Sequence, residues 1–383
     1  METKSKKSTL VNIFALASFL HDMGSDIVFS VWPIFVTDVL KANMAILGFI
    51  DGVGEAIVSL SQAVSGYLSD RIRRRKIFVW LGYLFGGIAR IGYALAPTWQ
   101  WLLPFRILDR SGKIRGSPRD AIISEISTKE NRGRNFGLLR SADNLGAVVG
   151  IILSIVLLGV IGYKPLFLLA AVPSVIAVFL LIIFIREEKP VQEKLHKTIR
   201  FRGFSSDLKM YTISSVLFAL GGFSYSFLLV FAKRFGFQTI HIPALYLSFT
   251  LVATLFSLPL GKLSDAIGRK KVLYLSFLFW ALVSILFLFW NSYIGIIIGF
   301  IFYGLHRAAI EPVQKSFVAE LSPKEFLASS LGGFQMAVGL SALPGSFIAG
   351  VLWDNFSIQA PFYFSLVLTS LALVLLTLVK EKK

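Results

Sequence analysis

Apolar runs of roughly twenty residues follow one another along almost the whole chain, and short polar breaks separate them. About 20 apolar residues in a helix are enough to cross the roughly 30 Å hydrocarbon core of a bilayer. The pattern predicts twelve transmembrane helices, near residues 10–39, 44–68, 77–96, 99–125, 135–160, 165–185, 210–235, 243–262, 272–290, 293–320, 328–352 and 359–379. The predicted fold class is therefore an all-α membrane protein.

Lysine and arginine gather in alternate breaks of this pattern. They are dense at both ends of the chain and at 71–76, 129–134, 186–209 and 269–271, and sparse in the breaks between. Cytoplasmic loops carry such an excess. We therefore expect a multi-pass protein of the cytoplasmic membrane with both termini inside. The net charge of +17 then reflects orientation, and it does not indicate nucleic-acid binding.

One of these basic breaks has a copy later in the chain. Residues 66–76 match residues 261–271 at seven of eleven positions with a constant offset of 195. A repeat of six helices keeps the same membrane orientation, which predicts two parallel six-helix repeats. The predicted domains are 1–187 and 210–383, joined by a linker at 188–209 that is either a solvated tether or a basic interfacial helix.

The repeated break resembles the signature Gly-x-Leu-x-Asp-Arg-x-Gly-Arg-Arg/Lys of the major facilitator superfamily. Its first copy has Arg73 at the inner glycine, and its second has Ala266 at the first arginine. Residues 106–121 are similar to the Asp-Arg-x-Gly-Lys…Pro-Arg-Asp run of a prokaryotic branch. The resemblance covers the whole chain and implies the fold of that superfamily, with solute transport by alternating access.

The resemblance also implies a gating role for the repeated break. The residues concerned are Gly66, Asp70, Arg71, Arg74, Gly261, Asp265 and Arg269. Asp70 is expected to meet residues 328–331, at the start of the eleventh helix, when the cytoplasmic side is shut. That position suits an anion because a helix N-terminus carries partial positive charge. Since only the first copy keeps its arginine, we expect the stronger contact at Asp70.

Ionisable residues inside the predicted spans are the candidates for substrate and proton binding, because charge is costly in hydrocarbon. The candidate set is Asp22, Asp26, Glu55, Asp109, Arg110, Lys113, Asp143, His306, Arg307 and Glu311. A second interpretation is that Arg106–Asp109, Arg140–Asp143 and Arg307–Glu311 are permanent ion pairs within their own helices. Arg115, Arg119 and Asp120 are expected to meet the cytoplasm, while Asp51 either takes part or is wetted at the outer mouth. Glycines such as Gly146 and Gly150 are expected to allow close helix approach.

These observations favour a secondary active transporter of a small solute, coupled to protons and leaning towards efflux of an amphiphilic compound. The alternatives are uptake of an anionic or zwitterionic solute, and a receptor or assembly factor that does not transport. Antiporters of the superfamily that this chain resembles often carry the motif Gly-Pro-x-x-Gly-Gly. Residues 146–151 lack its proline and its final glycine, which weakens the case for proton antiport.

No enzyme or phosphate-loop motif occurs, and there is no cysteine. We expect no enzymatic activity, cofactor, metal site or nucleic-acid partner. The expected partners are substrate, protons and membrane lipid, and the expected state is a monomer.

Overall fold

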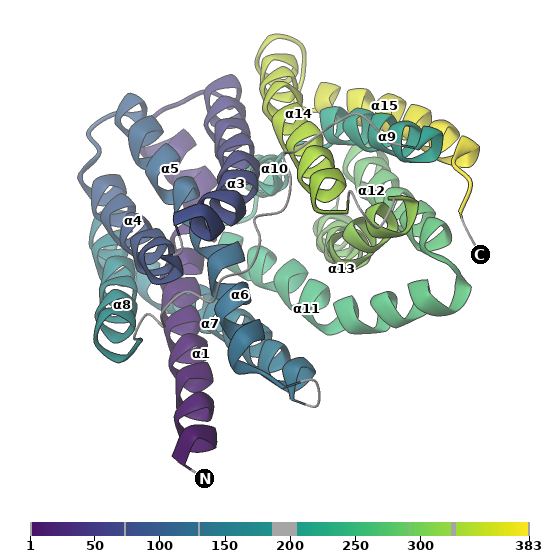
Figure 1. The fold of residues 1–383 in the computed structure, drawn as a ribbon. Coiled ribbons are helices and arrows are strands. Elements are labelled where there is room, and N and C mark those ends of the chain that lie inside the picture. Colours follow the sequence, from purple (N-terminus) through teal and green to yellow (C-terminus); the bar gives the residue numbers. More distant parts are fainter. Residues whose placement is uncertain are drawn as a thin grey trace. The chain divides into compact units, whose positions relative to one another are not determined.

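The computed structural model describes residues 2–72, 74–128, 131–185, 205–290, 292–322 and 327–381. Within these ranges the chain is helical, without strands, and each of the twelve predicted spans corresponds to one helix or to consecutive shorter ones (Figure 1). The predicted all-α membrane fold is confirmed. The predicted linker lies mostly outside the described ranges.

The chain divides into two compact units, Met1–Phe35 with Ile57–Lys197, and Val36–Ala56 with Thr198–Lys383. Helix α3 (Met44–Ile72) runs across this division. The short helices α2 (Trp32–Ile34) and η1 (Phe35–Val39) precede it. The predicted domains 1–187 and 210–383 were inferred from the sequence repeat, whereas the compact units are defined by contacts in space. The predicted boundaries therefore stay a prediction.

In the first unit, α1 (Glu2–Phe29) packs against α7 (Arg132–Ile161) and α8 (Tyr163–Phe184). Helix α4 (Arg75–Leu95) packs against α8 and α5 (Leu102–Ser111). Phe14 and Tyr83 lie in the buried apolar core that joins these helices. The core also contains Ile123 of α6 (Gly116–Ile126), the helix that carries Arg119.

The fourth span of the first unit is interrupted and rich in charge. It consists of η2 (Trp99–Trp101), α5, the 3₁₀ turn η3 (Gly112–Arg115) and α6 (Gly116–Ile126). Among the described residues, ten helices are long and apolar enough to cross a membrane. The number rises to eleven if the bent pair Thr9–Phe29 and Trp32–Val39 is one span. Residues 99–126 are outside that set, and their place in the fold comes from packing against α4.

The second unit contains α9 (Ser206–Gly221), α10 (Tyr225–Phe235), η4 (Thr239–His241), α11 (Ile242–Ile267), α12 (Arg269–Phe289), α13 (Tyr293–Leu321), α14 (Leu327–Asn355) and α15 (Ala360–Leu378). Helices α9 and α15 run side by side, and α13 packs against α11 and α12 (Figure 1). The seventh predicted span is broken between α9 and α10. Ser224 caps α10 there, and its side chain accepts a hydrogen bond from the Ser226 amide.

The repeated break differs between its two copies. Helix α3 continues to Ile72, so Asp70 and Arg71 have helical backbone, although the prediction ended this helix at residue 68. The side chains of Asp70 and Arg71 lie outside the described part of the structure, as do the surroundings of Gly66 and the side chains of residues 327–329. The expected contact of Asp70 therefore stays a prediction.

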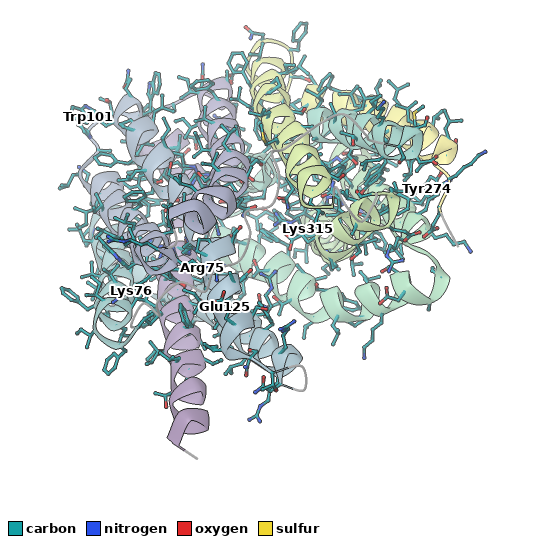
Figure 2. The ribbon with its side chains drawn as sticks, viewed as in Figure 1. Arg75, Lys76, Trp101, Glu125, Tyr274 and Lys315 are labelled. Carbon is teal, nitrogen blue, oxygen red and sulfur yellow. The ribbon has the colours of Figure 1, made fainter. Side chains whose placement is uncertain are left out.

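An arginine–glutamate ion pair occurs beside each copy, but the two arginines are not counterparts, because Arg269 corresponds to Arg74 at the offset of 195. Arg75 pairs with Glu125 in the first unit (Figure 2). In the second unit Arg269 lies 2.7 Å from Glu320 and 3.2 Å from Asp265. The two glutamates are related by the offset of 195. Arg74 is exposed at the N-cap of α4, and Gly261 has open space beside it.

Candidate functional site

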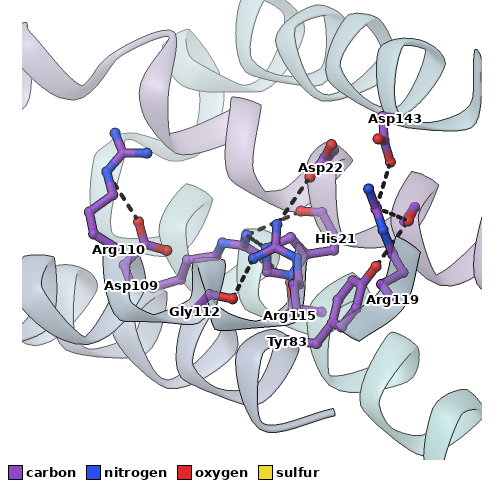
Figure 3. Close-up of polar contacts among 12 residues, drawn as sticks. His21, Asp22, Tyr83, Asp109, Arg110, Gly112, Arg115, Arg119 and Asp143 are labelled. Atoms are coloured by element: carbon purple, nitrogen blue, oxygen red, sulfur yellow. Dashed lines mark hydrogen bonds and ion pairs between the residues drawn. The ribbon is translucent and has the colours of Figure 1, made fainter. Parts of the chain in front are cut away.

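An acid on α1 meets a base on the fourth span in the middle of the first unit. Asp22 Oδ1 lies 3.7 Å from Arg115 Nη2, and the aspartate side chain is 27% exposed (Figure 3). The 3₁₀ turn η3 helps to fix the arginine, because Arg115 Nη1 donates to the Gly112 carbonyl at 3.0 Å. The guanidinium also lies over the Tyr83 ring, 4.9 Å from its centroid. Asp22 is thus held beside a buried, fixed positive charge.

A second acid–base pair lies beside the first. Arg119 Nη1 lies 3.5 Å from Asp143 Oδ1 on α7 and donates to Ser18 Oγ on α1 at 2.9 Å. Ser18 in turn lies 2.9 Å from the Tyr83 hydroxyl on α4. Arg119 also reaches Asp120, whose side chain is 51% exposed. This cluster ties α1, α4, α6 and α7 together through polar contacts (Figure 3).

Arg115 and Arg119 correct an expectation from the sequence. They were expected to meet the cytoplasm, yet Arg115 is buried and Arg119 is mostly buried. The reason is that both side chains turn towards carboxylates on other helices, Asp22 and Asp143. Spacing along one helix identifies neighbours in that helix and does not reveal partners across the bundle.

Arg90 is a fully buried cation that the sequence analysis did not single out. It donates to the carbonyls of Ala170 at 3.2 Å and His21 at 3.1 Å, and to Ser174 Oγ. Ser174 Oγ lies 3.1 Å from His21 Nδ1. The signal was available, because Arg90 stands inside the predicted span 77–96 and intramembrane charge is a functional candidate.

The candidates on α5 form a group of cations around one acid. Arg110 Nε lies 4.0 Å from Asp109 Oδ2, so Asp109 contacts its neighbour in sequence. Arg106 and Arg110 both lie over the Phe29 ring, at 5.1 and 4.4 Å from its centroid. Lys113 follows in η3 and is partly buried.

The remaining candidates are distributed over both units. Asp26 is partly buried in α1, and Glu55 is exposed in α3. The Arg307–Glu311 contact of the second interpretation is present, with Arg307 Nε 2.7 Å from Glu311 Oε1. His306 is buried, and its Nδ1 lies 2.9 Å from Ser276 Oγ.

Asp51 is a further residue whose position could not be decided from sequence. It is 2% exposed and accepts hydrogen bonds from Ser224 Oγ at 2.8 Å and Ser226 Oγ at 2.5 Å. The sequence left open whether Asp51 takes part in the site or is wetted at the outer mouth, and its burial argues against wetting. The two serines stand at the break between α9 and α10. The apolar run 210–235 gives no clear signal of that break.

The cluster in the first unit suits the binding of protons and charged groups. A carboxylate beside a guanidinium is attracted to it while the carboxylate is charged, and a bound proton removes that attraction. Arginine stays protonated throughout, so a proton entering this cluster would bind to a carboxylate. Asp22 and Asp143 each have such a partner.

Comparisons with known proteins agree with this architecture. A family model described as Major Facilitator Superfamily matches residues 14–253 and 211–383. An uncharacterized MFS-type transporter of Methanocaldococcus jannaschii is 34% identical over 98% of this chain and 96% of its own length. The multi-drug resistance efflux pump PmrA of Streptococcus pneumoniae is 24% identical over 90% of each chain.

A solved structure has a similar fold. It is a bacterial homolog of the human lysosomal transporter Spinster in an inward-facing and occupied conformation. The TM-score is 0.78 at 14% identity, covering 97% of this chain and 96% of the other. At that identity the likeness concerns the fold alone.

Proposed function

We propose that this chain, which belongs to the Major Facilitator Superfamily, moves a small solute across the cytoplasmic membrane by alternating access and couples that movement to protons. It is a multi-pass membrane protein and a transporter by family. Its proposed partners are the solute, protons and lipid, and it acts as a monomer with both termini in the cytoplasm. The repeated basic breaks support that orientation.

The observation that carries proton coupling is the pair of adjacent acid–base contacts in the first unit. Asp22 faces Arg115, and Asp143 faces Arg119, on four different helical segments. A proton that binds either carboxylate removes the attraction to its arginine, which weakens a link between helices. Loading and release of a proton therefore change how firmly α1 and α7 are held to the fourth span.

The proposed direction is efflux of an amphiphilic compound. The likeness to the Streptococcus pneumoniae efflux pump supports it over nearly the whole chain. The departure from the antiporter motif at residues 146–151 argues against it, so direction is a separate question for experiment.

A second candidate is uptake of an anionic or zwitterionic solute. It is favoured by the cations near Asp109, where Arg110 and the partly buried Lys113 stand in successive turns of one span. Buried positive charge attracts an anionic ligand when the protein's own acids are fewer than its bases. The two candidates differ in the charge of the transported compound.

Purified protein in proteoliposomes tests the proposal. Ethidium serves as the amphiphilic probe and labelled glutamate as the zwitterionic and anionic one, with an imposed pH gradient and a counterflow assay. We expect transport of one probe, and loss of gradient-driven transport in Asp22→Asn with counterflow retained. Asp120→Asn is the control, because its exposed carboxylate also contacts Arg119.

The outcomes separate the alternatives. Unchanged uptake and pH dependence in Asp22→Asn would remove Asp22 as a coupling residue. Binding without counterflow, detected by a ligand-induced rise in melting temperature, would identify a receptor, because a ligand that binds the folded state stabilises it.

A further inference from the structure

One face of α4 contacts both the acid and the base of the candidate site. Gly82, Gly86 and Arg90 follow one another at a spacing of four, which places them on the same face of the helix. The first of them lies against the base, because a Cβ atom at Gly82 would lie 2.7 Å from Arg115 Cβ in η3. The other two lie against the turn of α1 that carries Asp22.

Arg90 holds that turn through the backbone and the ring of His21. Its Nη2 donates to the His21 carbonyl at 3.1 Å and lies 3.5 Å from His21 Nε2. The ring fills the space beside Gly86, since a Cβ atom there would lie 2.5 Å from His21 Cε1. It also packs edge-on against Tyr83, with ring centroids 4.8 Å apart (Figure 3). Because His21 directly precedes Asp22, these contacts fix the part of α1 that carries the acid.

The same guanidinium is also fixed to α8. Arg90 Nη1 donates to the Ala170 carbonyl at 3.2 Å and to Ser174 Oγ, and both partners are buried. Gly24 of α1 leaves room for this arrangement, since a Cβ atom there would lie 2.6 Å from Arg90 Nη1. A guanidinium presents its donors in one rigid plane. One side chain of α4 therefore ties α1 and α8 together in a defined geometry.

The second unit packs its corresponding helices in the same way. A Cβ atom at Gly221 of α9 would lie 3.4 Å from the Ser365 carbonyl oxygen of α15. In the first unit, a Cβ atom at Gly24 of α1 would overlap the carbonyl oxygen of Ala170, which is the counterpart of Ser365 at the offset of 195. The two glycines therefore occupy equivalent places in their units.

The rings that precede these glycines differ in polarity. Three positions before the glycine, α9 has Phe218 where α1 has His21. Phe218 stacks on Phe277 of α12 with ring centroids 4.0 Å apart, whereas His21 packs on Tyr83 of α4. An apolar ring pair in the second unit thus replaces a polar one in the first.

The arginine itself is absent from the second unit at the equivalent place. The residue seven positions after the ring on α4 or α12 is Arg90 in the first unit and Ser284 in the second. Ser284 is buried, and its hydroxyl has no hydrogen-bond partner among the described residues. The same is true of Thr369, the counterpart of Ser174 at the offset of 195. The repeat therefore folds without a buried cation here, and the unit that has one is the unit with the acid–base pairs.

We propose that Arg90 is a positioning residue of the proton-coupling site, which holds α1 through His21 so that Asp22 faces its arginine. This role rests on the proposed function, and it acts at one remove from the charged pair. A merely structural arginine would stabilise the three helices and leave the attraction between Asp22 and Arg115 unchanged. A positioning arginine also sets the strength of that attraction, because it depends on the separation of the charges.

A mutant cycle tests this distinction without any substrate. Asp22→Asn, Arg115→Gln and the double variant are unfolded by denaturant in detergent micelles, and the cycle gives the coupling of the two charges as a factor in the unfolding equilibrium constant. Residues in contact show such coupling, and since the Asp22 side chain is 27% exposed we expect a modest factor of about five. Repeating the cycle in Arg90→Gln should bring the factor to about one.

Two further backgrounds separate position from charge. Arg90→Lys keeps the positive charge but lacks the planar fork that reaches several partners, so it should lower the factor as Arg90→Gln does. It also carries the test if Arg90→Gln does not fold. Ser284→Ala, at the equivalent place in the second unit, is the matched control and should leave the factor unchanged. The assignment is overturned by an unchanged factor in either Arg90 variant, or by a factor of about one in the unaltered chain.

Transport in proteoliposomes shows whether this position matters for coupling. Arg90→Lys should reduce transport driven by a pH gradient about fivefold, in line with the lost coupling factor, and retain counterflow. If no probe is transported and the factor still depends on Arg90, the proposed function fails while Arg90 keeps its role in placing Asp22. If the unaltered protein shows proton-driven transport and Arg90→Lys transports equally well, the function stands and the positioning role fails.

Discussion

Replacing Gly150 by alanine should loosen the contact between α7 and α1. A Cβ atom at this position would overlap the Met23 carbonyl oxygen and lie 2.9 Å from its carbonyl carbon and 3.1 Å from its Cα. All three atoms are backbone, so no side-chain rotation relieves the clash. Met23 is next to Asp22, and a displaced α1 therefore changes the distance from Asp22 to Arg115, now 3.7 Å.

The same helix supplies a matched control. Gly137 is exposed in α7, and a Cβ atom there would meet nothing within 4 Å. Alanine is better than glycine inside a helix by about 1 kcal/mol, and both variants share this gain. The difference between them is then the packing cost at Gly150, about 1–3 kcal/mol for an overpacked contact.

Two measurements on the purified variants check this reasoning. Unfolding by denaturant in detergent micelles should rank Gly150→Ala below Gly137→Ala in free energy of unfolding by that difference. Proteoliposome assays should show reduced coupled transport for Gly150→Ala alone. If Gly150→Ala were as stable as Gly137→Ala and transported equally well, the close approach of α1 and α7 would not set the geometry of Asp22.

Two further predictions concern Arg90 and the repeated break. Arg90→Gln should lower the free energy of unfolding by about 1–3 kcal/mol, because buried partners such as Ser174 lose their hydrogen bonds; unchanged denaturant unfolding would show that these contacts contribute nothing. Asp70→Asn should impair transport more than Asp265→Asn at equal expression, since Asp265 in the second copy has Arg269 as a local partner; the reverse order in a transport assay would contradict the ranking.

The number and approximate limits of the spans could be predicted because hydrophobic length has one physical cause, the thickness of the bilayer. Interruptions within spans were not predicted. The break before Ser224 and the 3₁₀ turn at Gly112–Arg115 depend on contacts with other helices, which a single run of residues does not specify. Local pattern locates a helix but does not determine whether it is continuous.

The acidic residues of the candidate site could be predicted from the sequence, and its basic residues only in part. Asp22 was identified because an acid inside a span is rare and costly. Its partner Arg115 was placed near the cytoplasm, since position along the fourth span was the only guide to depth. Which helices are neighbours decides ion pairing, and the sequence repeat does not contain that information.

The charge of the fourth span has a consequence for biogenesis. Each Lys, Arg or Asp near the centre of a helix adds about 2.5–3.5 kcal/mol to its cost of insertion through the translocon. Among the predicted spans, residues 99–126 alone are not among the described helices, or the bent first pair, that are long and apolar enough to cross a membrane.

The partners of this span appear in a fixed order during synthesis. Asp22 and Tyr83 are made before Arg115, whereas Asp143 is made after Arg119. We therefore expect residues 99–126 to enter the bilayer together with α1 and α4, and to complete their ion pairs only when α7 is made. The ion pairs proposed to respond to protons in the mature protein would then also lower the cost of inserting its fourth span.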